Sequence, residues 1–249
     1  MRIFAIGDLH LDGRQEKPMD VFGENWIDHE DKIFKYWKNN ISSDDLVLIP
    51  GDISWAMKLK DAYEDLKKID ELPGKKVMIR GNHDFWWESK NKMNNLDLTS
   101  IKFIVKDSVE YENVAVCGVR GWFNVNTSEL DEELSEEEKT TIEANRKHNL
   151  HIFDRELIRL RNSVEKIKDF SGLKIAMLHY PPFKITGELN EFGKILKEGN
   201  IDLCLYGHLH GEEGHKLVNE GKYDGVEYIC VSSDFLDFKI KEITLDSLQ

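Results

Sequence analysis

The chain has 249 residues, of which 40% are hydrophobic and 33% are charged, a composition typical of a soluble globular protein and unlike that of a disordered or fibrous one. Its 34 basic and 47 acidic side chains give a net charge of −13, which argues against a protein that coats nucleic acid through a basic surface. This balance does not exclude a small phosphate that is held by a local cationic site.

No stretch approaches the roughly 20 apolar residues of a membrane span, and the apolar run after Met1 is shorter than a signal-peptide core. Cys117, Cys204 and Cys230 lie in apolar, strand-like runs without CxxC spacing, which is the pattern of buried free thiols in a reducing compartment. We therefore expect a cytoplasmic protein with no membrane partner and no nucleic-acid partner, and the oligomeric state is left open.

Short runs rich in Ile, Val and Leu predict buried strands along the whole chain. In chain order they are 3–6, 46–49, 76–79, 114–119, 174–178, 203–206, 227–231 and 238–243. Helical periodicity fills four of the gaps, at 29–39, 59–72, 88–95 and 191–198. The alternation in the first half predicts an α/β fold with parallel strands, and the clustered strands near the C-terminus predict a second, more antiparallel sheet.

One acidic segment differs from this alternation, and it contains Ser135 and Glu138 at the spacing of a capping box. Beyond it, apolar residues recur at steps of three and four, which predicts an amphipathic helix packed on the sheet. They are Leu150, Phe153, Leu157, Leu160, Val164 and Ile167. No repeat or flexible linker divides the chain, so we expect a single domain over 1–249 with an acidic helical insertion at about 124–170.

Five motifs of Asp, Asn and His follow predicted strands, where ligands bind in open α/β sheets. They are Asp8-Leu9-His10, Gly51-Asp52, Gly81-Asn82-His83-Asp84, His179 and Gly207-His208-Leu209-His210. A single Asp after a strand is usually a turn or cap residue, and a single His in a loop is more often structural than a ligand. Five of the nine histidines nevertheless fall in these turns. The conjunction predicts a metal site.

In this order, the motifs resemble the DxH, GD, GNH[DE], H and GHxH signature of the calcineurin-like metallophosphoesterases, over residues 7–210. The resemblance implies a four-layer α/β/β/α sandwich of two mixed β-sheets flanked by helices, with a dinuclear metal site at the strand-end loops. It implies seven ligands: Asp8, His10 and His210 for the first ion, Asn82, His179 and His208 for the second, and Asp52 as the bridge. Imidazole and oxygen ligands suit Mn, Fe, Zn or Ni, so we expect two divalent ions, with Mn²⁺ as the first choice.

The resemblance also implies the reaction, which is metal-dependent hydrolysis of phosphate mono- or diesters by a hydroxide that two metal ions activate. Two divalent ions outweigh Asp8 and Asp52 in charge, so the site stays cationic and suits a small phosphate ester such as a nucleotide. In this family the histidine of GNH acts near the leaving-group oxygen, which makes His83 the expected catalytic residue, as a general acid or a charge stabiliser. Asp84 is either a partner of His83 or the N-cap of the next helix.

Departures from particular subgroups of the family narrow the substrate. Gly51-Asp52 continues as Ile-Ser-Trp-Ala, without the Asp-Arg-Gly ending that phosphoprotein phosphatases carry. Trp55 stands near the place where purple acid phosphatases use a tyrosine ligand, and a tryptophan cannot ligate a metal. The acidic balance argues against a nuclease. These differences favour the small phosphohydrolases and phosphodiesterases of the bacterial type.

Substrate contacts are suggested by side chains beside the motifs. Arg120 follows a predicted strand and can pair with a phosphate bidentately, and Arg14 and Arg80 are weaker candidates of the same kind. Trp55 and Trp86 can stack on a nucleobase or another flat leaving group, although packing between loops and sheet explains such aromatics equally simply.

Two other functions stay open on the sequence alone. The first is a catalytically silent member of the family that acts as a protein-binding scaffold, although such proteins usually lack the GNH histidine or several ligands, all of which are present here. The second is a metal-dependent amidohydrolase with an HxH start, which requires a TIM barrel, and the strand pattern is too irregular for eight βα units.

Overall fold

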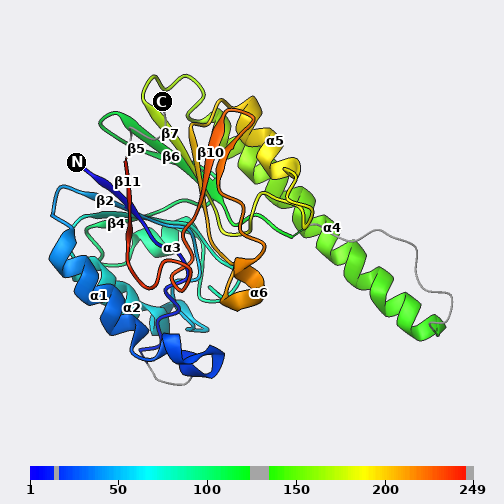
Figure 1. The fold of residues 1–249 in the computed structure, drawn as a ribbon, viewed down its shortest axis with the longest axis horizontal. Coiled ribbons are helices and arrows are strands. Elements are labelled where there is room, and N and C mark those ends of the chain that lie inside the picture. The colour runs from blue at the N-terminus through cyan, green and yellow to red at the C-terminus, as the bar shows by residue number, and fades with distance from the viewer. Residues whose placement is uncertain (14–16, 124–134, 245–249) are drawn as a thin grey trace.

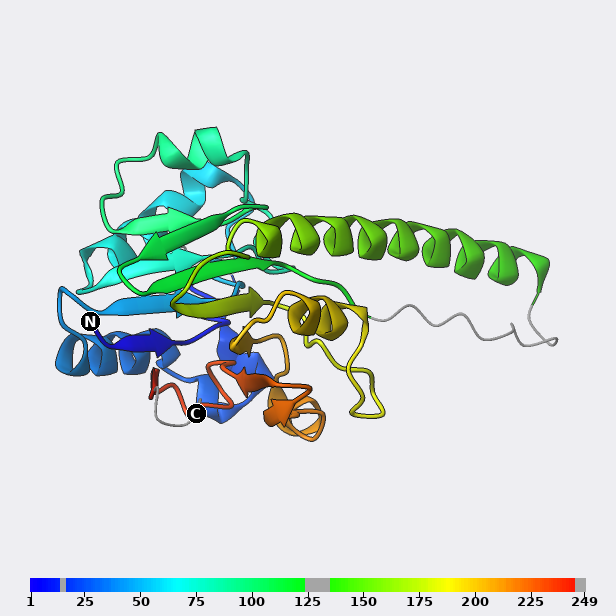
Figure 2. The ribbon, with the colours of Figure 1, turned by 90° about the horizontal axis from the view of Figure 1, so that it is seen from above.

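The computed structural model describes residues 1–13, 17–123 and 135–244, and it contains two β-sheets that lie face to face (Figures 1 and 2). The first sheet has the strand order β11-β1-β2-β3-β4. Its strands are β1 Ile3–Ala5, β2 Leu46–Ile49, β3 Lys75–Met78, β4 Ile101–Phe103 and β11 Lys241–Ile243. The second sheet has the order β5-β6-β7-β8-β10-β9. Its strands are β5 Ser108–Tyr111, β6 Val114–Val119, β7 Leu173–Leu178, β8 Leu203–Tyr206, β9 Gly221–Tyr223 and β10 Val226–Cys230.

Helices cover the outer face of each sheet, α1 and α2 on the first and α4 and α5 on the second (Figure 1). The α-helices are α1 His29–Asn40, α2 Leu59–Glu71, α3 Lys90–Asn94, α4 Glu136–Glu165, α5 Glu191–Glu198 and α6 Gly211–His215. Two short 3₁₀ helices, η1 Met19–Phe22 and η2 Glu24–Trp26, precede α1.

The side-chain alternation of the strands explains the four layers. In β2, Leu46 and Leu48 belong to the apolar cluster between the two sheets, while Val47 and Ile49 belong to the cluster beneath α1 and α2. A third cluster joins the outer face of the second sheet to α4 and α5. The central strands β1, β2, β6 and β8 therefore bury both faces, as parallel strands between helical layers do. The predicted α/β/β/α sandwich of two mixed sheets is confirmed.

The expectation that the second sheet is more antiparallel holds only at its edges, where it has two antiparallel pairs against one in the first sheet. Strands β6, β7, β8 and β10 run parallel, and only the edge strands β5 and β9 pair antiparallel. Parallel neighbours need long crossovers, and α4 and α5 provide them between β6 and β7 and between β7 and β8. The last strand begins at Lys241 instead of 238 because Asp237 and Phe238 have φ values of 52° and 56°, which an extended strand cannot accommodate.

Helix α4 has 30 residues and is therefore about 45 Å long. The capping box predicted from Ser135 and Glu138 is present at its start. Leu160 and Val164, in its C-terminal half, are buried against the second sheet, but its N-terminal half projects away from both sheets (Figure 2). Leu150 is 39% exposed. The predicted packing on the sheet thus holds for one half of the helix.

The three cysteines are free and buried, as expected. Among the described residues, none of the helices combines the length and the apolar composition that crossing a bilayer requires. Residues 124–134 of the expected insertion lie outside the described residues, and the single-domain organisation stays a prediction.

Candidate metal centre

All five motifs lie beyond the carboxyl ends of parallel strands, and the two sheets contribute separate sets of side chains. The first sheet supplies Asp8 and His10 after β1, Asp52 after β2, and Asn82 after β3. The second sheet supplies His179 after β7, and His208 and His210 after β8. Strand ends from both sheets therefore converge on one region.

Asp8, His10 and His210 form a first group, in which one ligand atom from each residue lies within 4.8 Å of the others. His210 Nε2 lies 3.2 Å from Asp8 Oδ1 and 3.5 Å from His10 Nε2. Asp8 and His10 are buried, and His10 Nδ1 makes no hydrogen bond within the described part of the chain. Two imidazole nitrogens and a carboxylate oxygen at these distances are suited to hold a shared cation.

Asp8, Asp52 and His179 form a second group by the same criterion. His179 Nδ1–H donates to the Pro50 carbonyl at 3.1 Å, which leaves the Nε2 lone pair directed at Asn82 Oδ1, 2.6 Å away, and at Asp52 Oδ2, 3.4 Å away. Three acceptor atoms this close together in a buried site are stabilised by a cation between them. The donor set therefore fits a metal ion.

Asp52 lies between the two groups, because its Oδ2 is also 3.7 Å from His10 Nε2. This geometry is that expected of the bridging ligand, although the bridge itself stays a prediction. His208 is placed less directly. Its ring centroid lies 5.1 Å from that of His179, and its backbone N–H donates to both carboxylate oxygens of Asp8 at 3.1 Å. Neither group includes the His208 side chain among the residues described.

The local backbone turns these side chains inward through unusual conformations. Asp8, His10, Asp52 and His208 have φ values of 57°, 45°, 51° and 75°, in the left-handed region that few non-glycine residues adopt. Residues in such conformations persist only where the surrounding structure holds them, and they cluster at functional sites. Close packing also requires a glycine at position 207, because a Cβ on Gly207 would overlap a carboxylate oxygen of Asp8.

Asp84 joins the turns after β2 and β3. Its buried carboxylate accepts backbone N–H groups from Asp52 at 2.9 Å, from Ile53 at 2.8 Å and from Gly81 at 2.7 Å. It also accepts the Ser54 N–H at 3.2 Å and the Trp86 indole N–H at 3.0 Å. Neither expected role for Asp84 is correct, since these donors occupy both oxygens and α3 begins only at Lys90. Its role is to fix the position of Asp52.

Asp234 supports the histidines from the second sheet, and it is not among the residues that the sequence predicts. Its Oδ1 lies 2.7 Å from His210 Nδ1, and its Oδ2 accepts the Gly211 backbone N–H at 2.8 Å and contacts His215 Nε2 at 3.1 Å. A ligating histidine usually gives its second ring N–H to such a partner, which fixes the ring. The one available signal is that Asp234 closely follows a strand, β10.

Burial and nearby charges shift the pKa values of the Asp52 and Asp8 carboxylates. Burial, together with the charges of Asp84 and Asp8, holds the pKa of Asp52 well above its usual range. Burial would also raise the pKa of Asp8, but the nearby His210 outweighs it and the pKa falls. Without a metal ion, the neighbouring carboxylates disfavour the ionised form of Asp52. A nearby cation would favour that ionised form. The electrostatics of Asp52 therefore fit a bound metal.

Among the histidines, the pKa values of His179 and His208 are lowered and that of His210 is raised. Burial lowers the pKa of His179 to about 3 and that of His208 to about 4, so both rings are neutral near pH 7, the form that binds metals. For His210, burial is outweighed by Asp8 and Asp234, which raise its pKa to about 10. A metal ion would therefore have to displace a proton from His210.

A pocket with a volume of about 290 Å³ adjoins the first group. It is lined by His10, Met19, Phe22, Trp26, Trp55, His83, His210 and Gly211. The His83 ring centroid lies 4.4 Å from that of Trp55, and the His83 backbone N–H donates to Asp52 Oδ1 at 2.8 Å. Burial, and then the charge of His210, lower the pKa of His83. The expected catalytic residue is thus half-buried between the metal centre and an aromatic wall.

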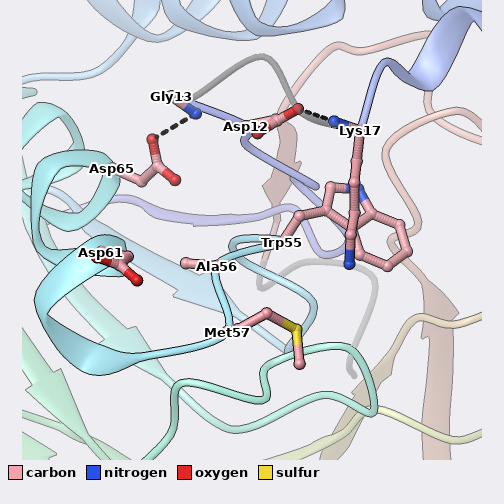
Figure 3. A pocket seen from close by; sticks show the side chains of 8 residues that line it. All are labelled: Asp12, Gly13, Lys17, Trp55, Ala56, Met57, Asp61 and Asp65. Atoms are coloured by element: carbon pink, nitrogen blue, oxygen red, sulfur yellow. Dashed lines mark hydrogen bonds between the residues drawn. The ribbon is translucent and has the colours of Figure 1, made fainter.

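The two tryptophans expected to contact substrate differ in position. Trp55 stacks on His10 with ring centroids 4.9 Å apart, and Lys17 Nζ lies 4.9 Å from its ring centre. It also lines a smaller pocket of about 50 Å³, where Asp65 accepts the Gly13 N–H (Figure 3). Trp86 is only 1% exposed and its indole is bonded to Asp84, so it lies in the core and presents no free face to a ligand.

Arg120 begins the loop after β6. Its carbonyl accepts the backbone N–H groups of His179 at 3.0 Å and Tyr180 at 2.9 Å, which places its backbone beside the metal centre. Its guanidinium group lies elsewhere, 4.4 Å from the Trp122 ring centre and 3.9 Å from Glu156 Oε1. Arg14, the weaker candidate, lies outside the described residues.

Comparisons with known proteins give a family match and a partial relative. The sequence pattern of a family described as calcineurin-like phosphoesterase matches residues 1–212. The Gene 66 protein of Mycobacterium phage L5 is 32% identical over 77 residues, which are 31% of this chain and 37% of that protein, so the match spans less than half of the phage protein.

Two solved structures resemble the whole chain. TT1561 of Thermus thermophilus is 13% identical with a TM-score of 0.52, and the match covers 98% of this chain and 99% of that one. AQ665 of Aquifex aeolicus is 15% identical with a TM-score of 0.49, over 97% and 95% of the two chains. The likeness to TT1561 supports the fold alone.

Proposed function

We propose, since the chain belongs to the calcineurin-like phosphoesterase family, that it hydrolyses small phosphate mono- or diesters at the metal centre described above. The observation that carries the proposal is the position of Asp52 Oδ2, 3.4 Å from His179 Nε2 and 3.7 Å from His10 Nε2. One carboxylate oxygen thus faces a ligand nitrogen from each of two groups. A residue in this position is suited to hold two ions together.

The centre takes two divalent ions, and Mn²⁺ is our first choice, with Fe, Zn or Ni as alternatives of the same ligand chemistry. When bound, such ions supply Lewis-acid activation of water and of the phosphoryl group. The protein contributes the orientation of the ligands: Asp84 fixes Asp52, the Pro50 carbonyl fixes His179, and Asp234 fixes His210.

His83 is the residue that we assign to the leaving group. Its ring borders both the metal centre and the aromatic pocket, with centroids 5.7 Å from His10 and 4.4 Å from Trp55. Because its pKa is lowered, the free protein holds a neutral imidazole at pH 7, which can donate one N–H to a leaving oxygen. The donated hydrogen bond would stabilise the charge that develops there.

The aromatic pocket favours a flat, apolar leaving group. Phe22, Trp26 and Trp55 contribute to its wall, and Phe22 is 66% exposed. Aromatic rings of this kind stack on nucleobases and aryl groups. We therefore propose nucleotides and aryl phosphates as the substrate class, in a cytoplasmic protein, as the free buried thiols suggest. A silent scaffold is disfavoured, because it would not need to keep His83 and the ligands in this arrangement.

The test is hydrolysis of a panel of nucleotides, cyclic nucleotides and aryl phosphates by protein loaded with Mn²⁺. We expect turnover that a chelator removes and that Asp52→Asn abolishes. Asp45→Asn is the matched control, because Asp45 is also a buried carboxylate beside β2 but pairs with Arg2, 2.7 Å away, at the opposite end of the strand. Failure of the metal-loaded protein to hydrolyse any member of the panel would contradict the proposal.

A further inference from the structure

A second pocket, of about 240 Å³, lies beside the metal centre and shares none of the seven predicted ligands. Its walls come from the ends of β4 and β6, the loop after β3, and helix α4. Two of its arginines are close to predicted metal ligands. Arg80 lies two residues before Asn82, and the Arg120 carbonyl accepts the His179 N–H. The pocket is therefore a separate site at the same edge of the fold.

The pocket is strongly cationic. Arg80, Arg120 and Arg159 line it, and Glu156 is the buried carboxylate among them. Glu156 Oε1 lies 2.7 Å from Arg159 Nη1 but 3.9 Å from Arg120 Nη2, so its close ion pair is with Arg159. The other acidic lining residue, Glu88, is exposed and pairs with Lys92, 3.1 Å away. Three guanidinium groups against one carboxylate leave a local excess of two positive charges.

Two of these arginines carry donors that the protein does not satisfy. Arg80 Nε and Arg120 Nε are buried and make no hydrogen bond to any described residue. Arg80 also makes no ion pair within 1–13, 17–123 and 135–244. Buried donors without an acceptor are unfavourable, so the two guanidinium groups that line this cationic pocket favour a ligand that supplies acceptor oxygens. The pocket volume far exceeds the roughly 10–15 Å³ that a single water needs.

We propose that this pocket binds a phosphate group, held by the guanidinium groups of Arg80 and Arg120, with Arg159 kept in place by Glu156. A dianionic phosphate matches the excess of two charges, and its tetrahedral oxygens accept the paired N–H groups of a guanidinium. The phosphate comes either from a second phosphate of the substrate or from free inorganic phosphate. The first source rests on the proposed function; the second does not.

The test counts inorganic phosphate on the metal-loaded protein by equilibrium dialysis. We expect two bound phosphates per chain, one at the metal centre and one in the arginine pocket. Arg120→Gln and Arg80→Gln should each weaken the second phosphate at least about tenfold, since each removes a charge-assisted, bidentate contact. Arg161→Gln is the control on α4, because Arg161 is exposed and pairs with Glu198 outside the pocket, and it should retain both phosphates.

A variant with the opposite effect distinguishes a specific loss of phosphate binding from misfolding. Glu156→Gln removes the competing negative charge and should tighten the second phosphate, which a merely damaged protein cannot do. Metal content per chain, measured in parallel, should stay unchanged in every variant. A wild-type protein that binds a single phosphate would overturn the proposal, as would arginine variants that keep two.

Kinetics distinguish the two sources. If the substrate supplies the second phosphate, Arg120→Gln should raise KM about tenfold for a nucleoside carrying two separate phosphates and leave KM for nitrophenyl phosphate unchanged. If free phosphate is the ligand, both KM values should be unchanged while the second phosphate is still lost. Two bound phosphates on a protein that hydrolyses none of the esters would uphold the pocket and contradict the proposed function.

Discussion

The first sheet holds its half of the metal centre through the backbone, whereas the second sheet holds its half through the histidine rings. Asp8 and Asp52 sit in left-handed turns, and Asp84 binds the N–H groups of the turn that carries Asp52. His179 and His210 are instead fixed by single acceptors on their Nδ1 atoms, the Pro50 carbonyl and Asp234. A substitution in the half held by the first sheet should therefore be tolerated less well than one in the other half, because it disturbs several hydrogen bonds at once.

Asp52 faces ligand nitrogens of both groups, so its loss should have the largest effect. We expect Asp52→Ala to lose both metal ions and all measurable turnover. This exceeds the roughly 10–100-fold loss of metal affinity or activity that is typical when a residue that only orients a ligand is replaced. His10→Ala, which removes a ligand from the first group alone, should retain part of the metal. Elemental analysis alongside turnover makes the comparison, and normal metal content with full activity in Asp52→Ala would contradict it.

His83 should separate chemistry from metal binding. Replacement by Asn or Ala should lower turnover by roughly 10²–10⁴-fold with metal content unchanged, since a general acid–base group contributes about this much. The loss should be smaller for a nitrophenyl ester, whose leaving group is already acidic, than for an alkyl or ribose leaving group. Equal losses for both would instead assign His83 to stabilising the phosphoryl oxygens.

Asp84→Asn tests the backbone-held half. The amide nitrogen cannot accept, so two buried N–H groups would face a donor, and we expect the free energy of unfolding to fall by about 2–4 kcal/mol. Asp65→Asn is the matched control. Asp65 is also buried and bonds Ser54 Oγ at 2.6 Å, but that hydroxyl can rotate to accept from an amide. Denaturant unfolding of both variants makes the comparison, and equal losses would contradict this account of Asp84.

Asp234→Asn tests the ring-held half and should act on metal affinity more than on folding. We expect affinity to fall about 10–100-fold, because His210 loses the acceptor that orients it. His215→Gln is the control, since His215 contacts the other oxygen of Asp234 and is not a predicted ligand. Metal titration of both proteins gives the result. A large loss of affinity in His215→Gln would assign the effect to the carboxylate as a whole.

The smallest effect concerns pH in protein stripped of metal by a chelator. The pKa of His210, about 10, lies above the ordinary value of 6.5, so its proton stabilises the fold fully below about pH 6.5, and this stabilisation is lost as the pH rises through about 10. His179 and His208, whose pKa values are lowered, work against stability only below about pH 6.5. Thermal melts should therefore show a maximum near pH 6.5 and a decline toward pH 10, which Asp234→Asn should flatten.

The sequence predicts the strands that precede the motifs well in both sheets, because each motif lies within a few residues of its strand. The strands β2, β6 and β8 match the expected ranges residue for residue. Strands β4, β5 and β9 are not predicted because each contains a charged residue, Lys102, Glu110 or Lys222, and so lacks the continuous apolar run of β2 and β8. The parallel order of the second sheet also escapes prediction, since it depends on how α4 and α5 return the chain.

Long-range partners are what the sequence does not predict. Asp234 reaches His210 from 24 residues away, and Glu156 meets Arg120 from 36 residues away. Apart from the position of Asp234 shortly after β10, nothing in the local pattern of either acidic residue distinguishes it from the many other carboxylates of an acidic chain. Burial distinguishes them, and burial follows only from the packed fold.

The pairing of β1 with β11 has a consequence for the order in which a newly made chain can complete the site. Ile3 is opposite Ile243, the Gly7 N–H donates to the Val231 carbonyl at 2.7 Å, and Ser233 Oγ donates to the Asp8 carbonyl at 2.7 Å. At translation rates of about 5–20 residues per second, Asp8 waits roughly 10–50 seconds for these partners to emerge from the ribosome. During that interval β1 can pair with β2 but lacks its other neighbour, so full metal binding becomes a late event of biosynthesis.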